Sequence, residues 1–183
     1  MKSGIWNLES GIWWCALALI ALGGVMHAEG TLRIVPLVRA EHVIVSVDLE
    51  NGYTDEVRQV INGGVRTTFT YDVELKMIVP AWVDRTIATA VITTTDHYDT
   101  LRRVHNLSRS VDGRVVEAVA TENEATAKKW LTTLNGLVLC RTSMLDPHRE
   151  YYVRISARVR PPGATLLGWA TGVTNLAKFT FLP

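Results

Sequence analysis

Most of the chain after Thr31 alternates between apolar and polar residues with a period of two. Successive side chains of a strand point to opposite faces, so this alternation predicts strands with one buried face. It is clearest in Val65–Val79, His42–Glu50 and Glu150–Arg160. One-sided alternation is typical of antiparallel sheets packed on a core. The predicted inward residues include Val43, Val45, Val47, Leu49, Val65, Phe69, Tyr71, Val73, Leu75, Met77, Tyr151, Val153, Ile155, Ala157 and Val159.

Weaker alternation predicts further strands along the chain. They cover Leu32–Val38, Ile87–Thr95, Leu101–Val111, Arg114–Ala120, Gly136–Thr142 and Lys178–Leu182. Asp112-Gly113 stands between two of them, and this pair favours a type I′ turn because both central residues of such a turn need positive φ. We therefore expect a tight hairpin at this point.

Two short helices are expected between the strands. Thr54 can cap the first, which Asn62-Gly63-Gly64 ends. The second is predicted to start at Thr121-Glu122-Asn123-Glu124, where a Thr and a Glu three residues later can form a capping box, and to stop near Asn135-Gly136. Together the elements predict one domain over residues 31–183. Its fold class is mainly β, an antiparallel β-sandwich with two short helices.

The N-terminus has the order of a secretory signal. Lys2 precedes an apolar run over Ile12–Met26, and Ala28 offers a small residue for cleavage. We interpret residues 1–28 as a signal peptide, which predicts a periplasmic or cell-envelope location. A retained anchor in the inner membrane is the alternative, but the run is shorter than the roughly 20 apolar residues a spanning helix needs, and Glu9 limits its extension. Only in that alternative is the protein membrane-associated.

Composition narrows the class of protein further. A formal net charge of +1 with 20% charged residues favours no nucleic-acid partner. Hydrophobic residues make up 48% of the chain, which is ordinary for a globular protein and argues against disorder. After removal of the signal, Cys140 is the remaining cysteine, so the mature chain cannot form an internal disulfide. The apolar core must hold the domain together.

Four sequence blocks, taken in order, resemble a known family. They are Thr54–Val57 leading through Ile61–Val65 to Thr68–Leu75, then Trp82-Val83-Asp84, then Tyr98–Leu101 leading through Arg103 to Leu107, and finally Tyr151–Ile155. Over His42 to Arg160 the chain resembles an exported bacterial family, domain of unknown function 4390. It departs at Val83, where a second aromatic beside Trp82 is expected. The resemblance implies an envelope location, in some cases with genes beside a sensor-kinase pair. It carries over no catalytic residue.

Two segments invite a catalytic or metal-binding interpretation. Cys140 follows Leu137-Val138-Leu139 and shares a predicted face with Val138, so we expect a buried, inert thiol. Asp96-His97-Tyr98-Asp99 is the densest group of ligand-type residues, but His105 and His148 are distant in sequence. Zinc sites need several His or Cys residues at fixed spacing, so a loop or strand-end cluster is favoured over a metal site.

Charged residues form stripes on the predicted strands. Asp48, Glu50, Asp72 and Glu74 would offer calcium four carboxylates if their strands were neighbours. Pairing with Arg154, Arg158 and Arg160 across strands is the favoured alternative. The same arginines could instead bind an anionic envelope polymer or lipid headgroup, and Arg103, His105 and Arg109 form a second basic face.

The sequence therefore predicts a non-catalytic binding module. Glycine-rich phosphate loops and a Gly-x-Ser-x-Gly elbow are absent from the sequence, and no cofactor or metal site is expected. Trp82 and Trp169 could be exposed anchors at a partner surface, or could pack over the ends of the sandwich. The partner would be a protein or an anionic envelope component, with a link to envelope signalling. The alternatives are a structural envelope component and a hydrolytic enzyme. The candidate contact residues are Trp82, Asp84, Arg103, Arg154, Arg158 and Arg160.

Overall fold

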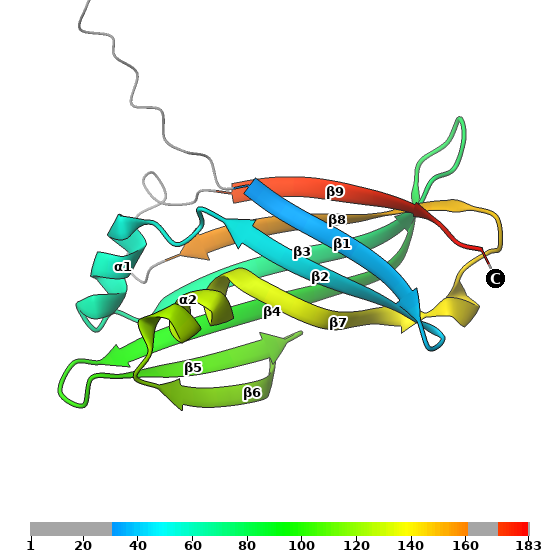
Figure 1. The fold of residues 1–183 in the computed structure, drawn as a ribbon. Coiled ribbons are helices and arrows are strands. Elements are labelled where there is room, and N and C mark those ends of the chain that lie inside the picture. Colours follow the sequence, from blue (N-terminus) through cyan, green and yellow to red (C-terminus); the bar gives the residue numbers. More distant parts are fainter. Residues whose placement is uncertain (1–30, 161–171, 183) are drawn as a thin grey trace, which may run out of the picture.

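The computed structural model describes residues 31–160 and 172–182, so the predicted signal segment and Trp169 lie outside the described residues. Strands and two short α-helices make up most of this part of the chain (Figure 1). The strands are β1 (Thr31–Arg39), β2 (His42–Glu50), β3 (Thr67–Met77), β4 (Arg85–Asp99), β5 (Val104–Val111), β6 (Arg114–Thr121), β7 (Thr133–Arg141), β8 (Glu150–Arg160) and β9 (Gly172–Thr180). The helices are α1 (Asp55–Asn62) and α2 (Glu124–Thr132), and a 3-10 turn spans Thr142–Met144.

The strands form two antiparallel sheets packed face to face. The smaller sheet has the order β1-β2-β7, and the larger has the order β6-β5-β4-β3-β8-β9. In Figure 1 the smaller sheet lies in front of the larger one. The predicted mainly β, antiparallel sandwich with two short helices is therefore confirmed.

The core lies between the two sheets and consists largely of the predicted inward residues. On β2, β3 and β8 every second side chain is buried, as the alternation predicts. Val65 is the exception at 38% exposed, because β3 begins only at Thr67 and Val65 precedes the ladder. Helix α2 is attached to the core by its Leu131 carbonyl, which accepts hydrogen bonds from Tyr71 Oη (2.6 Å) and Thr94 Oγ1 (3.1 Å).

The predicted bounds of several strands are wrong, because the length of each of these strands is set by its pairing with a neighbouring strand and not by the local sequence pattern. β4 extends over 15 residues because it pairs with β3 from Arg85 to Asp96 and with β5 as far as Asp99. β9 covers Gly172–Thr180 instead of Lys178–Leu182, since it pairs with β8 from Arg158 back to Glu150. β5 starts at Val104 because residues before it form the turn after β4. β7 starts at Thr133, directly after α2.

The first helix is confirmed and the second needs a correction. Thr54 Oγ1 accepts a hydrogen bond from the Val57 amide (3.3 Å), and Gly63 ends α1. The cap of α2 is Asn123, whose Oδ1 accepts from the Thr126 amide (3.2 Å), while Thr121 stays in β6. The predicted capping box does not form because strand pairing with His105 holds Thr121. The helix also ends earlier, at Thr132.

The two long sides of the sandwich differ. On one side β1 approaches β9, and Asn175 Nδ2 donates a hydrogen bond to the Leu32 carbonyl (2.6 Å) between the sheets. On the other side the larger sheet continues past β7 with β5 and β6 (Figure 1). Within the described residues no helix has both the length and the apolar character needed to span a membrane.

Candidate functional site

The outer edge of the larger sheet is formed by β6, which is exposed along nearly its whole length. Seven of its eight residues are exposed, including Val115 at 67% and Val116 at 59%. The described part of the chain places no strand beyond it, so one row of backbone N–H and C=O groups has no strand partner. The segment carries neither lysine nor proline, which commonly protect such edges. An exposed apolar edge of this kind is suited to strand addition.

The position of β6 follows from the turn before it. Asp112 and Gly113 both have positive φ, 49° and 79°, as the sequence predicted for a type I′ hairpin. Asp112 Oδ1 also accepts a hydrogen bond from the Val91 amide (2.9 Å), which ties the turn to β4. A register shift between Arg109 and Ser110 leaves Val116 without a partner in the ladder. β6 is therefore a fixed strand of the sheet, with a bulge near its start.

Helix α2 packs on β4 and β5 and less closely on β6, most of whose residues stay exposed. The Arg109 guanidinium lies 4.4 Å from the centre of the Trp130 ring and pairs with Glu117 of β6 (Nη1–Oε2, 3.2 Å). Trp130 Nε1 in turn donates to the Ser108 carbonyl (3.4 Å). This contact holds the β5–β6 hairpin against α2, so the edge keeps its shape without a partner.

The other edge strands offer less to a partner. β9 is the opposite edge of the larger sheet, but it lies beside β1. β7 is an edge of the smaller sheet, but its register with β2 shifts twice and Gly136 has a positive φ of 69°. This backbone is less regular than that of β6, whose register with β5 shifts once, and it makes a poorer template for a further strand. Of the described edge strands, β6 carries the two most exposed large apolar side chains, Val115 and Val116.

The predicted arginine stripe is neutralised within the molecule. Arg154 Nε donates to Glu74 Oε2 (2.8 Å), and Arg158 pairs with Asp72, each pair joining β8 to β3 in register. The hydrogen bond from Arg154 lowers the pKa of Glu74. Cross-strand charge pairing is thus confirmed for these two arginines. Arg160 faces Thr68 in the ladder, and its side chain lies outside the described part.

The second predicted basic face does not form. Arg103 lies in the β4–β5 turn with φ of 58° and is exposed. His105 and Arg109 point to the inner side of β5, where His105 is buried and Arg109 pairs with Glu117. The predicted strand over Leu101–Val111 starts too early, so Arg103 and His105 do not share a face as its alternation suggested.

Trp82 and Asp84 lie in the hairpin between β3 and β4. Trp82 and Val83 at its tip are 81% and 80% exposed. Trp82 is therefore exposed, as one of the two alternatives predicted, and does not pack over the end of the sandwich. Asp84 accepts hydrogen bonds from the Val79 amide (3.3 Å) and from Tyr152 Oη (3.0 Å). The aspartate therefore braces the hairpin from below.

A buried Asp–His pair is the feature that sequence reasoning missed. The separation of His105 from Asp96 in the sequence argues against a shared site, but the β4–β5 ladder places His105 beside Tyr98, and its Nδ1 lies 2.8 Å from Asp96 Oδ2. Both side chains are buried, and burial raises the pKa of Asp96 against the lowering effect of the His105 hydrogen bond. The alternation on the two strands could have shown that both residues face inward. No group of three or more metal-ligating side chains occurs among the described residues.

Two other predicted features are settled by the sheet topology. Asp48 and Glu50 lie on β2 in the smaller sheet, so they do not meet Asp72 and Glu74 on β3 in the larger one. Cys140 is buried, and burial raises the pKa of its thiol. It does not share a face with Val138, because the register shift after Val43 turns Val138 outward, where it is 54% exposed.

Comparison with known proteins gives one finding. A family model described as a domain of unknown function (DUF4390) matches residues 32–161. The match covers β1 to β8 and both helices, and so includes the exposed β6 edge and the β3–β4 hairpin. Neither a curated protein nor a solved structure matches the chain.

Proposed function

The chain belongs to the DUF4390 family, a domain of unknown function, and from this premise we propose that it is an exported envelope domain that acts by binding another protein at the β6 edge. The observation that carries the proposal is an ordered edge strand with exposed valines and a free row of backbone hydrogen-bonding groups. A partner segment in extended conformation would add a seventh strand to the larger sheet. Main-chain hydrogen bonds would supply the affinity, and contacts to Val115 and Val119 the specificity.

Charge at the two ends of β6 would orient the incoming strand. Arg114 starts the strand and has no ion pair among the described residues, while Glu122 follows its end. A partner with an acidic residue near Arg114 and a basic residue near Glu122 would match this polarity. An accessory role in envelope signalling fits such a module, because strand addition joins two proteins without chemistry.

A hydrolytic activity has less support. An Asp–His pair can orient a general base, but catalysis needs that base within reach of a substrate. His105 is only 3% exposed, and its ring packs 4.6 Å from the ring of Tyr98. A purely structural envelope role, the other alternative, would leave the open edge without a use.

The proposal is tested by photo-crosslinking in cells that express the full chain. A photoreactive residue replaces Ala118 in the middle of β6, and the matched control replaces Val138 on β7, which is also an exposed edge position. We expect a discrete adduct with a different protein from position 118 and none from position 138. Val116→Lys should abolish the adduct, because a charge on the edge opposes pairing. No adduct, or equal adducts from both positions, would refute binding at β6, and an adduct of twice the chain mass would identify a second copy as the donor.

The exported location has its own test. N-terminal sequencing of the protein recovered from the envelope fraction should give a start after Ala28. A start at Met1 in that fraction would support the anchored alternative, and recovery from the cytoplasm would contradict export.

A further inference from the structure

Few buried side chains fasten the β5–β6 hairpin to the core. Among the described residues 104–121, His105 and Leu107 are the two that are buried. The other side-chain link is the contact of Arg109 and the Ser108 carbonyl with Trp130, which is only partly buried. One of the two buried anchors of the hairpin is therefore a side chain that can gain or lose a proton.

This anchor is bonded to a carboxylate that depends on it. His105 Nδ1 lies 2.8 Å from Asp96 Oδ2, and the Asp96 side chain is fully buried. The second oxygen, Asp96 Oδ1, is buried without a hydrogen-bond partner among the described residues. Thr67 lies opposite Asp96 on β3, but its hydroxyl donates to the Val65 carbonyl (3.2 Å) instead. Within the described part of the chain, His105 is thus the side chain that satisfies the Asp96 carboxylate.

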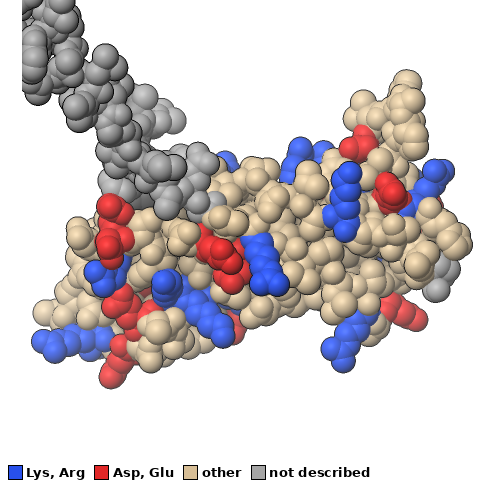
Figure 2. All heavy atoms as spheres, turned by 45° about the horizontal axis from the view of Figure 1, so that its top comes forward, with Lys and Arg blue, Asp and Glu red and all other residues tan. Residues whose placement is uncertain are grey.

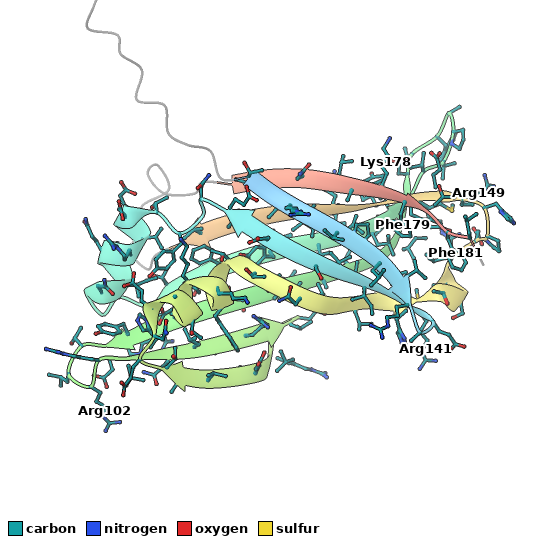
Figure 3. All side chains as sticks on the ribbon, in the orientation of Figure 1. Arg102, Arg141, Arg149, Lys178, Phe179 and Phe181 are labelled. Atoms are coloured by element: carbon teal, nitrogen blue, oxygen red, sulfur yellow. The ribbon has the colours of Figure 1, made fainter. Side chains whose placement is uncertain are left out.

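The pair lies at the end of the sandwich where both helices are found. The β4–β5 turn, marked by Arg102 in Figure 3, is at this end, and β4 contacts both helices. In Figure 2 acidic and basic side chains are mixed on the surface here. The titratable or charged side chains on the elements around the pair are His97 and Tyr98 of β4, Arg109 of β5, Tyr71 of β3, Tyr53 and Arg58 at α1, and Glu124 and Lys128 of α2.

A buried carboxylate with one hydrogen bond is tolerated only while its charge is matched. With one added proton the pair is neutral overall, because either His105 is a cation opposite Asp96 or the carboxyl is uncharged. Loss of that proton leaves a buried negative charge beside a neutral ring. In agreement with this, burial raises the pKa of Asp96. The folded protein then keeps a proton that the unfolded chain releases at lower pH, so the free energy of unfolding falls as the pH rises from the ordinary carboxyl pKa to the raised one.

We propose that Asp96 and His105 form a proton-sensitive latch on the β5–β6 hairpin. While the pair carries its added proton, His105 holds β5 against the core. When the proton is lost, β5 loosens from the core and the β6 edge loosens with it. The effect on partner binding rests on the proposed function of β6, and it predicts tighter binding at lower pH, whereas the latch itself depends on the pair alone.

The test is amide hydrogen exchange, read by mass spectrometry, on protein purified after expression of the full chain. Samples cover about pH 4 to pH 8, a range that spans the ordinary carboxyl and imidazole pKa values, and rates are corrected for the pH dependence of chemical exchange. Asp96→Asn removes the titrating carboxyl and keeps its shape, and His105→Gln removes the ring that can carry the charge. The matched control is Asp48→Asn, the same change at an exposed position of β2. Peptides from β3 and β8 report opening of the whole core in the same samples.

In the wild type and the control, amides of residues 104–121 should exchange about tenfold faster at the upper end of the pH range, while those of β3 and β8 keep their rates. Asp96→Asn should abolish this pH dependence. His105→Gln should exchange fast at neutral pH and more slowly in acid, where the carboxyl becomes neutral. A flat wild-type profile would overturn the proposal without any variant having to fold, and so would a pH dependence that survives in Asp96→Asn.

The measurement separates the latch from the proposed function. It contains no partner, so a failure to find an adduct at the β6 edge would leave the exchange result unchanged. Conversely, capture of a partner at position 118 with a flat exchange profile would keep β6 as a binding edge and remove the latch.

Discussion

Removing both hydroxyl groups that bind the Leu131 carbonyl should destabilise the protein by more than the sum of the two single changes. Leu131 lies in the last turn of α2, where a carbonyl has no partner within the helix. Tyr71 Oη and Thr94 Oγ1 both donate to it instead, from β3 and β4. Burial raises the pKa of Tyr71, so its hydroxyl stays protonated as a donor at neutral pH.

The structure gives the expected magnitudes. Tyr71→Phe or Thr94→Val removes one hydrogen bond and leaves the carbonyl one donor, so each should cost about 1 kcal/mol. The double variant leaves a buried carbonyl without a donor, which adds a desolvation penalty of about 1–3 kcal/mol. The total should therefore be about 4 kcal/mol, with a coupling of about 2 kcal/mol.

Urea unfolding of the four proteins, followed by circular dichroism, measures this coupling. The slope of unfolding free energy against urea should stay the same, because all four proteins expose the same surface on unfolding. Additivity of the two single changes to within about 0.5 kcal/mol would refute the reasoning, since the carbonyl would then have another partner.

Three further predictions concern single side chains. The Tyr53 hydroxyl is buried without a hydrogen-bond partner among the described residues, and its pKa is raised to about 12. Tyr53→Phe should therefore raise the unfolding free energy by up to about 1 kcal/mol and remove one late-titrating phenol. A loss of stability would contradict this. Arg154 lowers the pKa of Glu74, so Glu74→Gln should destabilise the protein at pH 7, and the difference in melting temperature should vanish as the pH falls through that lowered pKa. A difference that persists in acid would exclude this ion pair as its cause. Iodoacetamide should label the Cys140 thiol far more slowly in native protein than in urea, and fast native labelling would show an exposed thiolate.

The sequence predicted the core strands well because their pattern is local. In β2 and β8 the apolar residues keep a strict period of two, and both strands have the predicted bounds. The Asp112-Gly113 turn was also predictable, since the required φ values depend on the two residues themselves. Prediction failed where a neighbouring strand sets the outcome, as for Thr121, which pairs in β6 instead of capping α2.

The candidate sites were harder to predict for the same reason. The sequence identified Trp82 and Asp84, but only the structure shows that Asp84 holds the tip outward through Tyr152, far away in the chain. It also identified Arg154 and Arg158, and the β3–β8 register then shows that both are paired. Asp96 and His105 are separated in the sequence, and only the pairing of β4 with β5 shows that they lie side by side.

By itself, the sequence determined the fold class and the inward face of the central strands, because side-chain alternation and turn residues act over a few neighbouring positions. Tertiary structure alone decided which strands became edges, which charges found partners and which apolar residues stayed uncovered. β6 alternates like its neighbours in the chain, yet seven of its eight residues are exposed, because the smaller sheet ends at β7 and α2 packs more closely on β4 and β5 than on β6. Burial depends on what lies opposite a side chain, and that is set by the packing of the whole molecule.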